Sequence, residues 1–214
     1  MKFRKINNIY FVGIGGIGMS GISELLMNLG FHVSGSDITE NNNVKRLKNI
    51  GVRVNIGHSA KNISNDIDTI VYSSAIPDDN PELNTAKSLG IPLIRRAEML
   101  GELISVKETS IAVGGTHGKT TTSSMIGNLL TYAKIDPTLV VGGLVHTLDT
   151  NSKLGSGSII VVEADEYDRS FLALSPTIAV VTNIELEHTD CYGSLEDIKK
   201  SFKQLCQSIP FYGE

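Results

Sequence analysis

The sequence predicts an α/β protein built from two successive units. Short apolar runs of strand length alternate with stretches whose apolar residues recur at helical spacing. Two of these runs lead into glycine-rich turns, Gly13–Gly18 and Gly114–Gly118. The polar stretch Val106–Thr109 separates the two series. We therefore place a domain boundary there, with residues 1–107 in the first domain and 108–214 in the second.

The first strand and helix carry a pattern that is typical of dinucleotide-binding domains. Ile9–Val12 is an apolar run, and Gly13–Gly18 fits G-x-G-x-x-G ahead of a helix that ends near Gly30. The next strand, Phe31–Val33, leads to Asp37, about twenty positions beyond the glycines. In this arrangement a phosphate lies at the helix N-terminus and the carboxylate accepts a ribose hydroxyl. The pattern predicts a Rossmann-like domain and leaves the identity of the ligand open.

Further alternation of strands and helices completes a parallel sheet with right-handed crossovers. We expect strands at Val52–Val54, Thr69–Tyr72 and Ile91–Ile94. We expect helices at Pro81–Leu89 and Ala97–Ile104, and one that contains Val44, Leu47 and Lys48 and ends at Gly51. Ligands of such sheets bind beyond the C-terminal strand ends, so the residues that follow the strands should converge there. The candidate binding residues are Gly15, Gly16, Ile17, Gly18, Met19, Asp37, Ser73 and Ser74. His32 and His58 are interpreted as ordinary surface or turn histidines.

The second unit begins with a predicted phosphate loop. The strand Ile111–Val113 runs into a glycine turn, and apolar residues then recur at helical spacing from Met125 onward. Backbone N–H groups of such a loop bind phosphate, Lys119 can reach the β- and γ-phosphates, and the Thr120 hydroxyl can bind Mg²⁺. The loop is one residue shorter than the usual pattern. The candidate nucleotide-binding residues are Gly114, Gly115, Thr116, His117, Gly118, Lys119 and Thr120.

Carboxylates and a histidine follow the later strands of this unit. We expect strands at Leu139–Val141, Ser158–Val162 and Thr177–Val181, and an amphipathic helix, Leu195–Cys206, that Ser194 caps. Glu163 is the first acidic side chain after a central strand, where a Mg²⁺ ligand is needed. His188 follows the next strand at the same edge. Thr120, Glu163 and His188 are therefore the candidate metal ligands.

The composition restricts the class of protein. Hydrophobic residues make up 41% of the 214 residues and charged residues 20%, as in globular proteins. The formal net charge of −4 argues against a nucleic-acid-binding surface. Cys191 and Cys206 have no metal-ligand spacing and indicate a reducing compartment, and the basic start, Met1–Lys5, is followed by too little apolar sequence for a signal peptide. We expect a cytoplasmic protein without membrane insertion.

Together these motifs resemble the Mur ligase family, whose members form amide bonds in peptidoglycan synthesis at the expense of ATP. Gly114–Thr122 is similar to the family's short phosphate loop, and Glu163–Glu166 and Thr182–Asp190 resemble its metal-binding segments. Gly13–Gly21 and Ser73–Ile76, together with the segment that ends at Asp37, look like those of members that join L-alanine to UDP-N-acetylmuramate. The resemblance spans nearly the whole chain.

The resemblance implies a reaction and a role for each motif. ATP would phosphorylate the lactoyl carboxylate of UDP-N-acetylmuramate, and the amine of L-alanine would attack the acyl phosphate and release phosphate. Lys119, His117 and Asn183 are implied in catalysis. Thr120 and Glu163 would hold one Mg²⁺, and His188 would help to hold a second. The glycine edge of the first domain would bind the UDP group.

The resemblance also implies that other parts belong to a complete enzyme. Family members have three domains, and this chain corresponds to the UDP-binding domain and the first part of the central P-loop ATPase-type domain. We therefore expect this piece not to complete the ligation, while binding of the UDP-sugar stays possible. Some relatives carry a carbamylated lysine near the second metal; Lys199, Lys200 and Lys203 lie in that region, and none is assigned the role.

Three alternatives stay open at this point. A sister ligase that recycles muramoyl-tripeptide shares the Thr116–Thr120 sequence. A nicotinamide-dependent oxidoreductase would use the first glycine motif and Asp37 but would leave Lys119 and Glu163 without a role. A non-catalytic nucleotide-binding module is the third alternative. Binding of NAD(H) rather than a UDP-sugar separates the oxidoreductase from the ligases.

Overall fold

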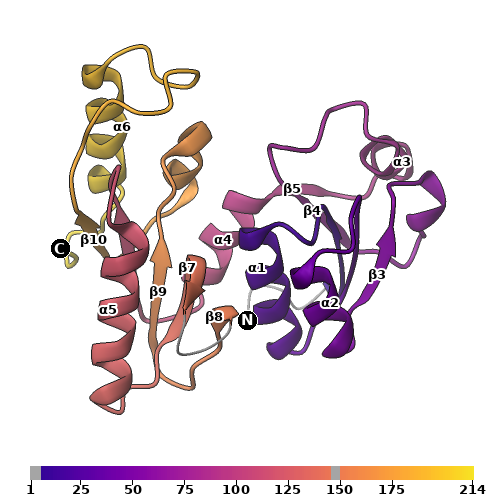
Figure 1. Cartoon of the computed structure of the whole chain (residues 1–214), viewed down its shortest axis with the longest axis horizontal. Helices are drawn as coiled ribbons and strands as arrows, with labels where there is room; N and C mark the ends of the chain where they lie inside the picture. Colours follow the sequence, from indigo (N-terminus) through magenta and orange to yellow (C-terminus); the bar gives the residue numbers. More distant parts are fainter. Residues whose placement is uncertain (1–5, 146–149) are drawn as a thin grey trace. The chain divides into compact units, whose positions relative to one another are not determined.

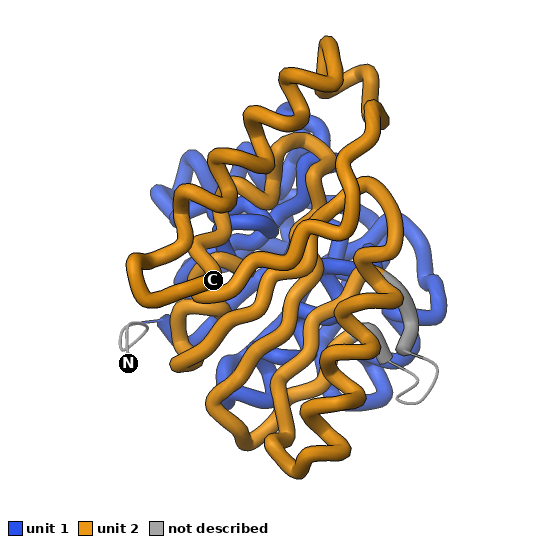
Figure 2. Tube along the Cα trace, turned by 90° about the vertical axis from the view of Figure 1, so that its left-hand side faces the viewer, with its two compact units in different colours: residues 1–99 blue, residues 100–214 orange. Residues whose placement is uncertain are grey.

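The computed structural model describes residues 6–145 and 150–214, and the basic start, predicted not to form a signal peptide, lies outside them. Contacts between residues divide the chain into two compact units, Met1–Met99 and Leu100–Glu214 (Figure 2). This division falls inside helix α4 (Arg96–Ile104), before the boundary that the sequence suggests at 107/108. Gly101 in α4 packs closely against Ala173 of the second unit, since a Cβ at Gly101 would lie 2.5 Å from the Ala173 backbone oxygen. This contact explains in part why the end of α4 belongs to the second unit.

The first unit is a five-stranded parallel sheet with the strand order β3-β2-β1-β4-β5 (Figure 1). The order reverses at β1, as in a doubly wound sheet, and the predicted Rossmann-like class is confirmed. The strands are β1 (Asn8–Val12), β2 (His32–Asp37), β3 (Arg53–Ile56), β4 (Thr69–Tyr72) and β5 (Leu93–Arg95). The helices are α1 (Ile17–Asn28), α2 (Asn42–Asn49), α3 (Pro81–Leu89) and α4, with a 3₁₀ turn, η1, at Ala60–Asn62.

Local sequence signals set the helix ends. Pro81 lies in the first turn of α3, where it removes no intrahelical hydrogen bond, and the Asn80 side chain accepts the Glu82 N–H at 2.8 Å. The helix ends at Gly90 in the left-handed conformation. Asn41 caps α2 in the same way as Asn80 caps α3. Helix α1 follows Gly16 and has no cap from any side chain that the structure describes.

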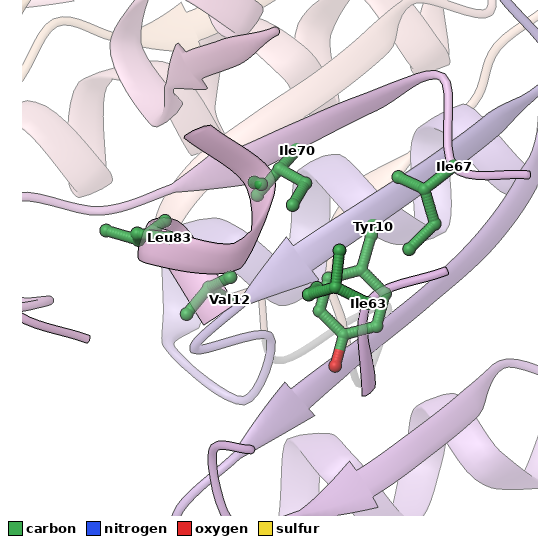
Figure 3. Close-up of a cluster of buried hydrophobic side chains, with 7 residues drawn as sticks. Tyr10, Val12, Ile63, Ile67, Ile70 and Leu83 are labelled. Atoms are coloured by element: carbon green, nitrogen blue, oxygen red, sulfur yellow. The ribbon is translucent and has the colours of Figure 1, made fainter. Parts of the chain in front are cut away.

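A hydrophobic core lies on one face of the first sheet, beneath α3 and the segment around η1 (Figure 3). The buried side chains are Tyr10, Val12, Ile63, Ile67, Ile70, Leu83 and Ala86. The Tyr10 hydroxyl points out of this cluster and donates to Oε1 of Glu82 at 3.0 Å. Burial raises the pKa of Tyr10 above its ordinary value, so the hydroxyl stays protonated as the donor.

Glu82 is the centre of a buried polar network in this unit. Its Oε2 accepts the Ser36 hydroxyl at 2.6 Å and lies 2.9 Å from Nδ1 of His58. The His58 side chain is 14% exposed and that of Glu82 is 0% exposed. His58, interpreted as a surface or turn histidine, lies in the irregular segment after β3, where a buried carboxylate on α3 draws its ring inward.

The second unit is a five-stranded sheet with the order β10-β6-β9-β7-β8. Its strands are β6 (Thr109–Gly114), β7 (Thr138–Val145), β8 (Thr150–Lys153), β9 (Ile159–Glu163) and β10 (Ile178–Val181). The pairs are parallel except β7–β8, which is antiparallel. The helices are α5 (Lys119–Tyr132) and α6 (Leu195–Gln207), with a 3₁₀ segment, η2, at Tyr167–Ala173. The sequence analysis predicted the parallel strands and missed β8.

Helices α5 and α6 cover opposite faces of this second sheet. Val113 packs in a core cluster with Ile126 and Leu130 of α5. The next residue, Gly114, faces the other way, and a Cβ there would lie 3.1 Å from the Phe202 ring of α6. With both faces covered, the strand ends are the accessible part of the sheet. Within the described ranges, no helix is long and apolar enough to cross a membrane.

Candidate functional site

A tight glycine loop joins β6 to α5 in the second unit. Gly115 has φ +131° and Gly118 has φ +82°, conformations that side chains rarely adopt. Gly115 also has no room for a side chain, because a Cβ would collide with the Thr182 hydroxyl. Gly118 is the N-cap of α5, and no side chain in the described ranges caps this helix. The first-turn N–H groups of α5 are thus placed as in a phosphate-binding loop.

Residues at the end of β10 hold this loop in shape. The Asn183 side chain accepts the His117 N–H at 3.1 Å and donates to the His117 carbonyl at 3.0 Å. The Thr182 hydroxyl donates to the same carbonyl at 2.6 Å. The Thr116 N–H donates to the Asn183 carbonyl at 3.1 Å. The structure therefore places Asn183, which the family resemblance implied in catalysis, as a clamp on the loop backbone.

Lys119 lies at the loop, as predicted, but is paired with an unexpected residue. Its Nζ donates to the carbonyl oxygens of Gly115 at 2.6 Å and Thr116 at 3.3 Å. The same atom lies 2.9 and 2.7 Å from the two carboxylate oxygens of Glu166. The Glu166 side chain is 0% exposed and that of Lys119 is 17% exposed. The ammonium is thus neutralised by a fully buried carboxylate that the sequence analysis did not select.

The three predicted metal ligands differ in their surroundings. Glu163 ends β9, and its Oε1 accepts the Ser123 hydroxyl of α5 at 3.2 Å. Thr120 is exposed in the first turn of α5. His188 contacts Glu166 instead of Glu163, with its Nε2 3.5 Å from Oε1 of Glu166.

One group of side chains in the described ranges has the spacing of a metal site. Ligand atoms of Glu166, Glu187 and His188 lie within 4.8 Å of one another. Nε2 of His117, whose side chain is 57% exposed, lies 3.6 Å from Oε1 of Glu187. His188 is therefore grouped with Glu166 and Glu187 and not with Thr120 and Glu163, the other two predicted ligands.

Strained turns bring Glu166 and His188 together. His188 has φ +52°, and Asp168 and Arg169 have φ +54° and +55°. Each such non-glycine conformation costs about 1–3 kcal/mol and persists where the surroundings enforce it. The Tyr192 hydroxyl donates to the backbone oxygen of Glu166 at 2.7 Å, and the Arg169 guanidinium lies 5.1 Å from the Tyr192 ring centre. Burial raises the pKa of Tyr192 to about 12, which keeps its hydroxyl a donor.

In the first unit, Asp37 closes the glycine loop. Its Oδ2 accepts the Gly15 N–H at 2.8 Å, and its Oδ1 accepts the Thr39 N–H at 3.1 Å. The side-chain amides of Asn41 and Asn43 donate to the Gly15 carbonyl at 3.1 and 2.9 Å. Asp37, which is predicted to accept a ribose hydroxyl, is 7% exposed and bonded to backbone in the structure.

The turn after β4 and the start of α4 also lie at this edge. Ile76, in the turn after Ser73 and Ser74, would lie 3.1 Å from a Cβ at Gly13. The Arg96 guanidinium, at the start of α4, packs closely over Gly18: a Cβ added there would lie 2.9 Å from its Nη1. The first turn of α1, Ile17–Met19, contains no acidic residue. A guanidinium beside the positive end of a helix dipole favours an anion between them.

Comparison with known protein families identifies the family to which the two units belong. The model of the Mur ligase family, catalytic domain, matches residues 8–108. The model of the Mur ligase middle domain matches residues 113–213. The chain belongs to the Mur ligase family.

Curated relatives resemble this Mur ligase chain along its whole length. Proteins named UDP-N-acetylmuramate–L-alanine ligase include one from Trichlorobacter lovleyi, 55% identical over 212 residues that cover 99% of this chain and 46% of that protein. One from Aquifex aeolicus is 52% identical over 213 residues, which cover 100% of this chain and 46% of that protein. The chain therefore spans about half the length of these relatives.

Solved structures agree with the Mur ligase fold. The UDP-N-acetylmuramate–alanine ligase MurC from Thermotoga maritima matches with a TM-score of 0.87 at 33% identity, over 94% of this chain and 47% of that chain. The UDP-N-acetylmuramate:L-alanyl-γ-D-glutamyl-meso-diaminopimelate ligase from Neisseria meningitides matches with a TM-score of 0.89 at 28% identity, over 97% and 70%. The predicted Mur ligase resemblance is confirmed.

Sequence reasoning missed Glu166 and Arg96 of this Mur ligase, although signals for both exist. Glu163 is the first carboxylate after the predicted strand Ser158–Val162 and ends β9 in the structure, and Glu166 follows it by one irregular turn. Arg96 directly follows β5, so the rule that selected Ser73 and Ser74 after β4 also applies to it. What the sequence lacks is the direction of each side chain, which depends on the turns that follow the strands.

Proposed function

We propose that this chain is the UDP-substrate-binding and nucleotide-binding part of a cytoplasmic, ATP-dependent enzyme that joins L-alanine to UDP-N-acetylmuramate in peptidoglycan precursor synthesis. One observation carries the proposal: behind each glycine loop, at α1 and at α5, lies a helix N-terminus that no side chain in the described ranges caps. Such termini bind phosphate groups. The names of the curated relatives support L-alanine as the amino acid.

In the second unit, the loop Gly114–Thr120 would bind the phosphates of ATP. Its backbone N–H groups and Lys119 would offset the charge of the transferring phosphoryl group. Asn183 would keep the loop in this shape through its two hydrogen bonds to His117.

The donor set of this unit fits Mg²⁺. The Thr120 hydroxyl and the Glu163 carboxylate are oxygen ligands of the kind that Mg²⁺ prefers, and both lie at the start of α5 or beside it. His188, with its neighbouring carboxylates, would help to hold a second ion. Bound Mg²⁺ would supply positive charge that stabilises the phosphoryl group and the acyl phosphate.

In the first unit, the pyrophosphate of the UDP-sugar would lie on the first turn of α1. The backbone of Gly15–Met19 would supply N–H donors, and the Arg96 guanidinium would supply a charge-assisted hydrogen bond. Asp37 would shape this loop through its bond to Gly15, and Ser73 and Ser74 would line the same edge.

A second candidate is a ligase for a muramoyl-peptide substrate. The similarity to the Neisseria meningitides structure, with coverage of 70% of that chain, favours this alternative. Both candidates use a UDP-linked substrate and a nucleotide. Ligation assays with L-alanine and with the tripeptide separate them.

The experiment that tests the proposal is calorimetric titration of UDP-N-acetylmuramate into the chain, with UDP-N-acetylglucosamine and NADH as control ligands. We expect saturable binding of the muramate and none of NADH. Arg96→Ala should weaken muramate binding about tenfold, the loss expected for one charge-assisted hydrogen bond. Binding of NADH instead would support the oxidoreductase alternative and refute the proposal.

A further inference from the structure

The donors of Lys119 are committed to partners within its own unit. An ammonium has three N–H donors. They face the carbonyl oxygens of Gly115 and Thr116 and both carboxylate oxygens of Glu166, at 2.6 to 3.3 Å from Nζ. A phosphate oxygen that binds Lys119 must therefore replace one of these partners.

Glu166 is the partner that competes most directly with a phosphate. Both are anionic acceptors of the same ammonium, whereas the carbonyls of Gly115 and Thr116 are neutral and belong to the loop. The Glu166 carboxylate is 0% exposed, so water screens its attraction for Lys119 very little. While the two are paired, the positive charge of Lys119 is largely cancelled for an approaching nucleotide.

We propose that Glu166 is a positioning residue: it holds Lys119 against the loop carbonyls and is the partner that Lys119 must leave to reach a nucleotide phosphate. This inference rests on the proposed function, because it assumes that the loop binds ATP. Glu166 thereby lowers the affinity of the loop for ATP and fixes where the ammonium lies before ATP arrives.

A buried carboxylate without a counter-charge is strongly unfavourable, so Glu166 needs a new partner once Lys119 has moved. Nε2 of His188 lies 3.5 Å from its Oε1, and a carboxylate oxygen of Glu187 lies within 4.8 Å of both ligand atoms. This donor set fits a divalent cation. Glu166 therefore couples the binding of ATP to the binding of Mg²⁺.

The surroundings allow the carboxylate to be changed without disturbing its backbone. The Tyr192 hydroxyl binds the backbone oxygen of Glu166 and not its side chain. Glu166→Gln keeps the shape of the side chain and one acceptor for Lys119 while it removes the charge. Glu185→Gln is the charge-matched control, because the Glu185 side chain is 65% exposed and lies near the loop, 3.9 Å from His117.

The test is calorimetric titration of ATP into the chain and both variants, once with excess Mg²⁺ and once with EDTA. In EDTA we expect Glu166→Gln to bind ATP about tenfold more tightly than the unaltered chain, which corresponds to about 1.4 kcal/mol. The ratio of the affinities with and without Mg²⁺ should shrink by a similar factor. Glu185→Gln should change the affinity less than about twofold, because exposed charges are screened.

A second readout requires no nucleotide. Acylation of Lys119 by an amine-reactive reagent, followed by peptide mass spectrometry, should rise several-fold in Glu166→Gln and stay unchanged in Glu185→Gln. Circular dichroism and thermal melting check that the variants are folded. If Glu166→Gln does not fold, Glu166→Asp replaces it: its shorter side chain loosens the contact with Lys119, and tighter ATP binding in EDTA is again expected.

Weaker or unchanged ATP binding by a folded Glu166 variant overturns the inference while leaving the proposed function intact, since Glu166 would then support Lys119 in the nucleotide complex. Failure of the unaltered chain to bind ATP, with or without Mg²⁺, would refute the nucleotide part of the proposed function and the inference with it.

Discussion

Asn183 offers a quantitative test of how the phosphate loop keeps its shape. Its side chain makes two hydrogen bonds to His117, at 3.1 and 3.0 Å. Each such bond contributes about 0.5–1.5 kcal/mol, and Asn183 is partly exposed, so water replaces part of what is lost. Asn183→Ala should therefore lower the free energy of unfolding of the second unit by about 1 kcal/mol.

A matched variant separates the two bonds. Asn183→Asp keeps an acceptor for the His117 N–H but places a carboxylate oxygen beside the His117 carbonyl, where the amide nitrogen now donates at 3.0 Å. It should destabilise the unit at least as much as alanine at neutral pH. Urea unfolding measures the free energies, and hydrogen exchange measures protection of the His117 amide. Full protection of that amide in Asn183→Ala would refute the clamp.

Four further variants test other parts of the second unit. Gly115→Ala should lower the free energy of unfolding by about 3 kcal/mol, because it adds a collision with the Thr182 hydroxyl to an unfavourable φ. Gly118→Ala has open space around the new Cβ and should lower it by about 1 kcal/mol. Equal urea midpoints for the two variants would contradict this difference. Phe202→Ala should lower the free energy of unfolding by about 3–5 kcal/mol, since the ring is 1% exposed and fills the space above Gly114. A loss below about 1 kcal/mol would show that α6 is poorly packed. Hydrogen bonds from Lys153 and Ser156 hold the pKa of Asp136 well below its ordinary value of 3.8. A carboxyl group whose pKa is lowered in the folded state stabilises the fold above pH 3.8, and this contribution is lost as the pH falls toward the lowered pKa. Asp136→Asn should therefore make the unfolding free energy depend less steeply on pH in acid. An unchanged slope would rule this out.

The sequence predicts the sheet order of neither unit, but it predicts most of the strands. Buried parallel strands such as Ile159–Glu163 are short apolar runs with glycine or polar residues at both ends, and this pattern is visible without a structure. Strand β8, Thr150–Lys153, was missed because Thr-Asn-Ser-Lys has no apolar run. Its strand conformation depends on pairing with β7, which is a tertiary interaction.

In the candidate sites too, some features can be predicted from the sequence and others depend on tertiary contacts. Lys119 and the glycines of its loop could be predicted, because their positions are fixed by the strand–loop–helix sequence itself. Glu166 could not be separated from Glu163, because its direction depends on the left-handed turn at Asp168 and on the Tyr192 hydrogen bond. Likewise, the sequence shows Asp37 at the right spacing but not that its carboxylate is bonded to the Gly15 N–H.

We propose that each unit carries its own phosphate site, one for the UDP-sugar and one for ATP. Hydrogen exchange with mass spectrometry, recorded with each ligand separately, tests it most directly. UDP-N-acetylmuramate should protect the amides of residues 15–19 and leave those of residues 115–121 unchanged, while ATP with Mg²⁺ should do the reverse. Protection of the same segment by both ligands, or of neither segment by saturating ligand, would contradict the presence of two separate phosphate sites.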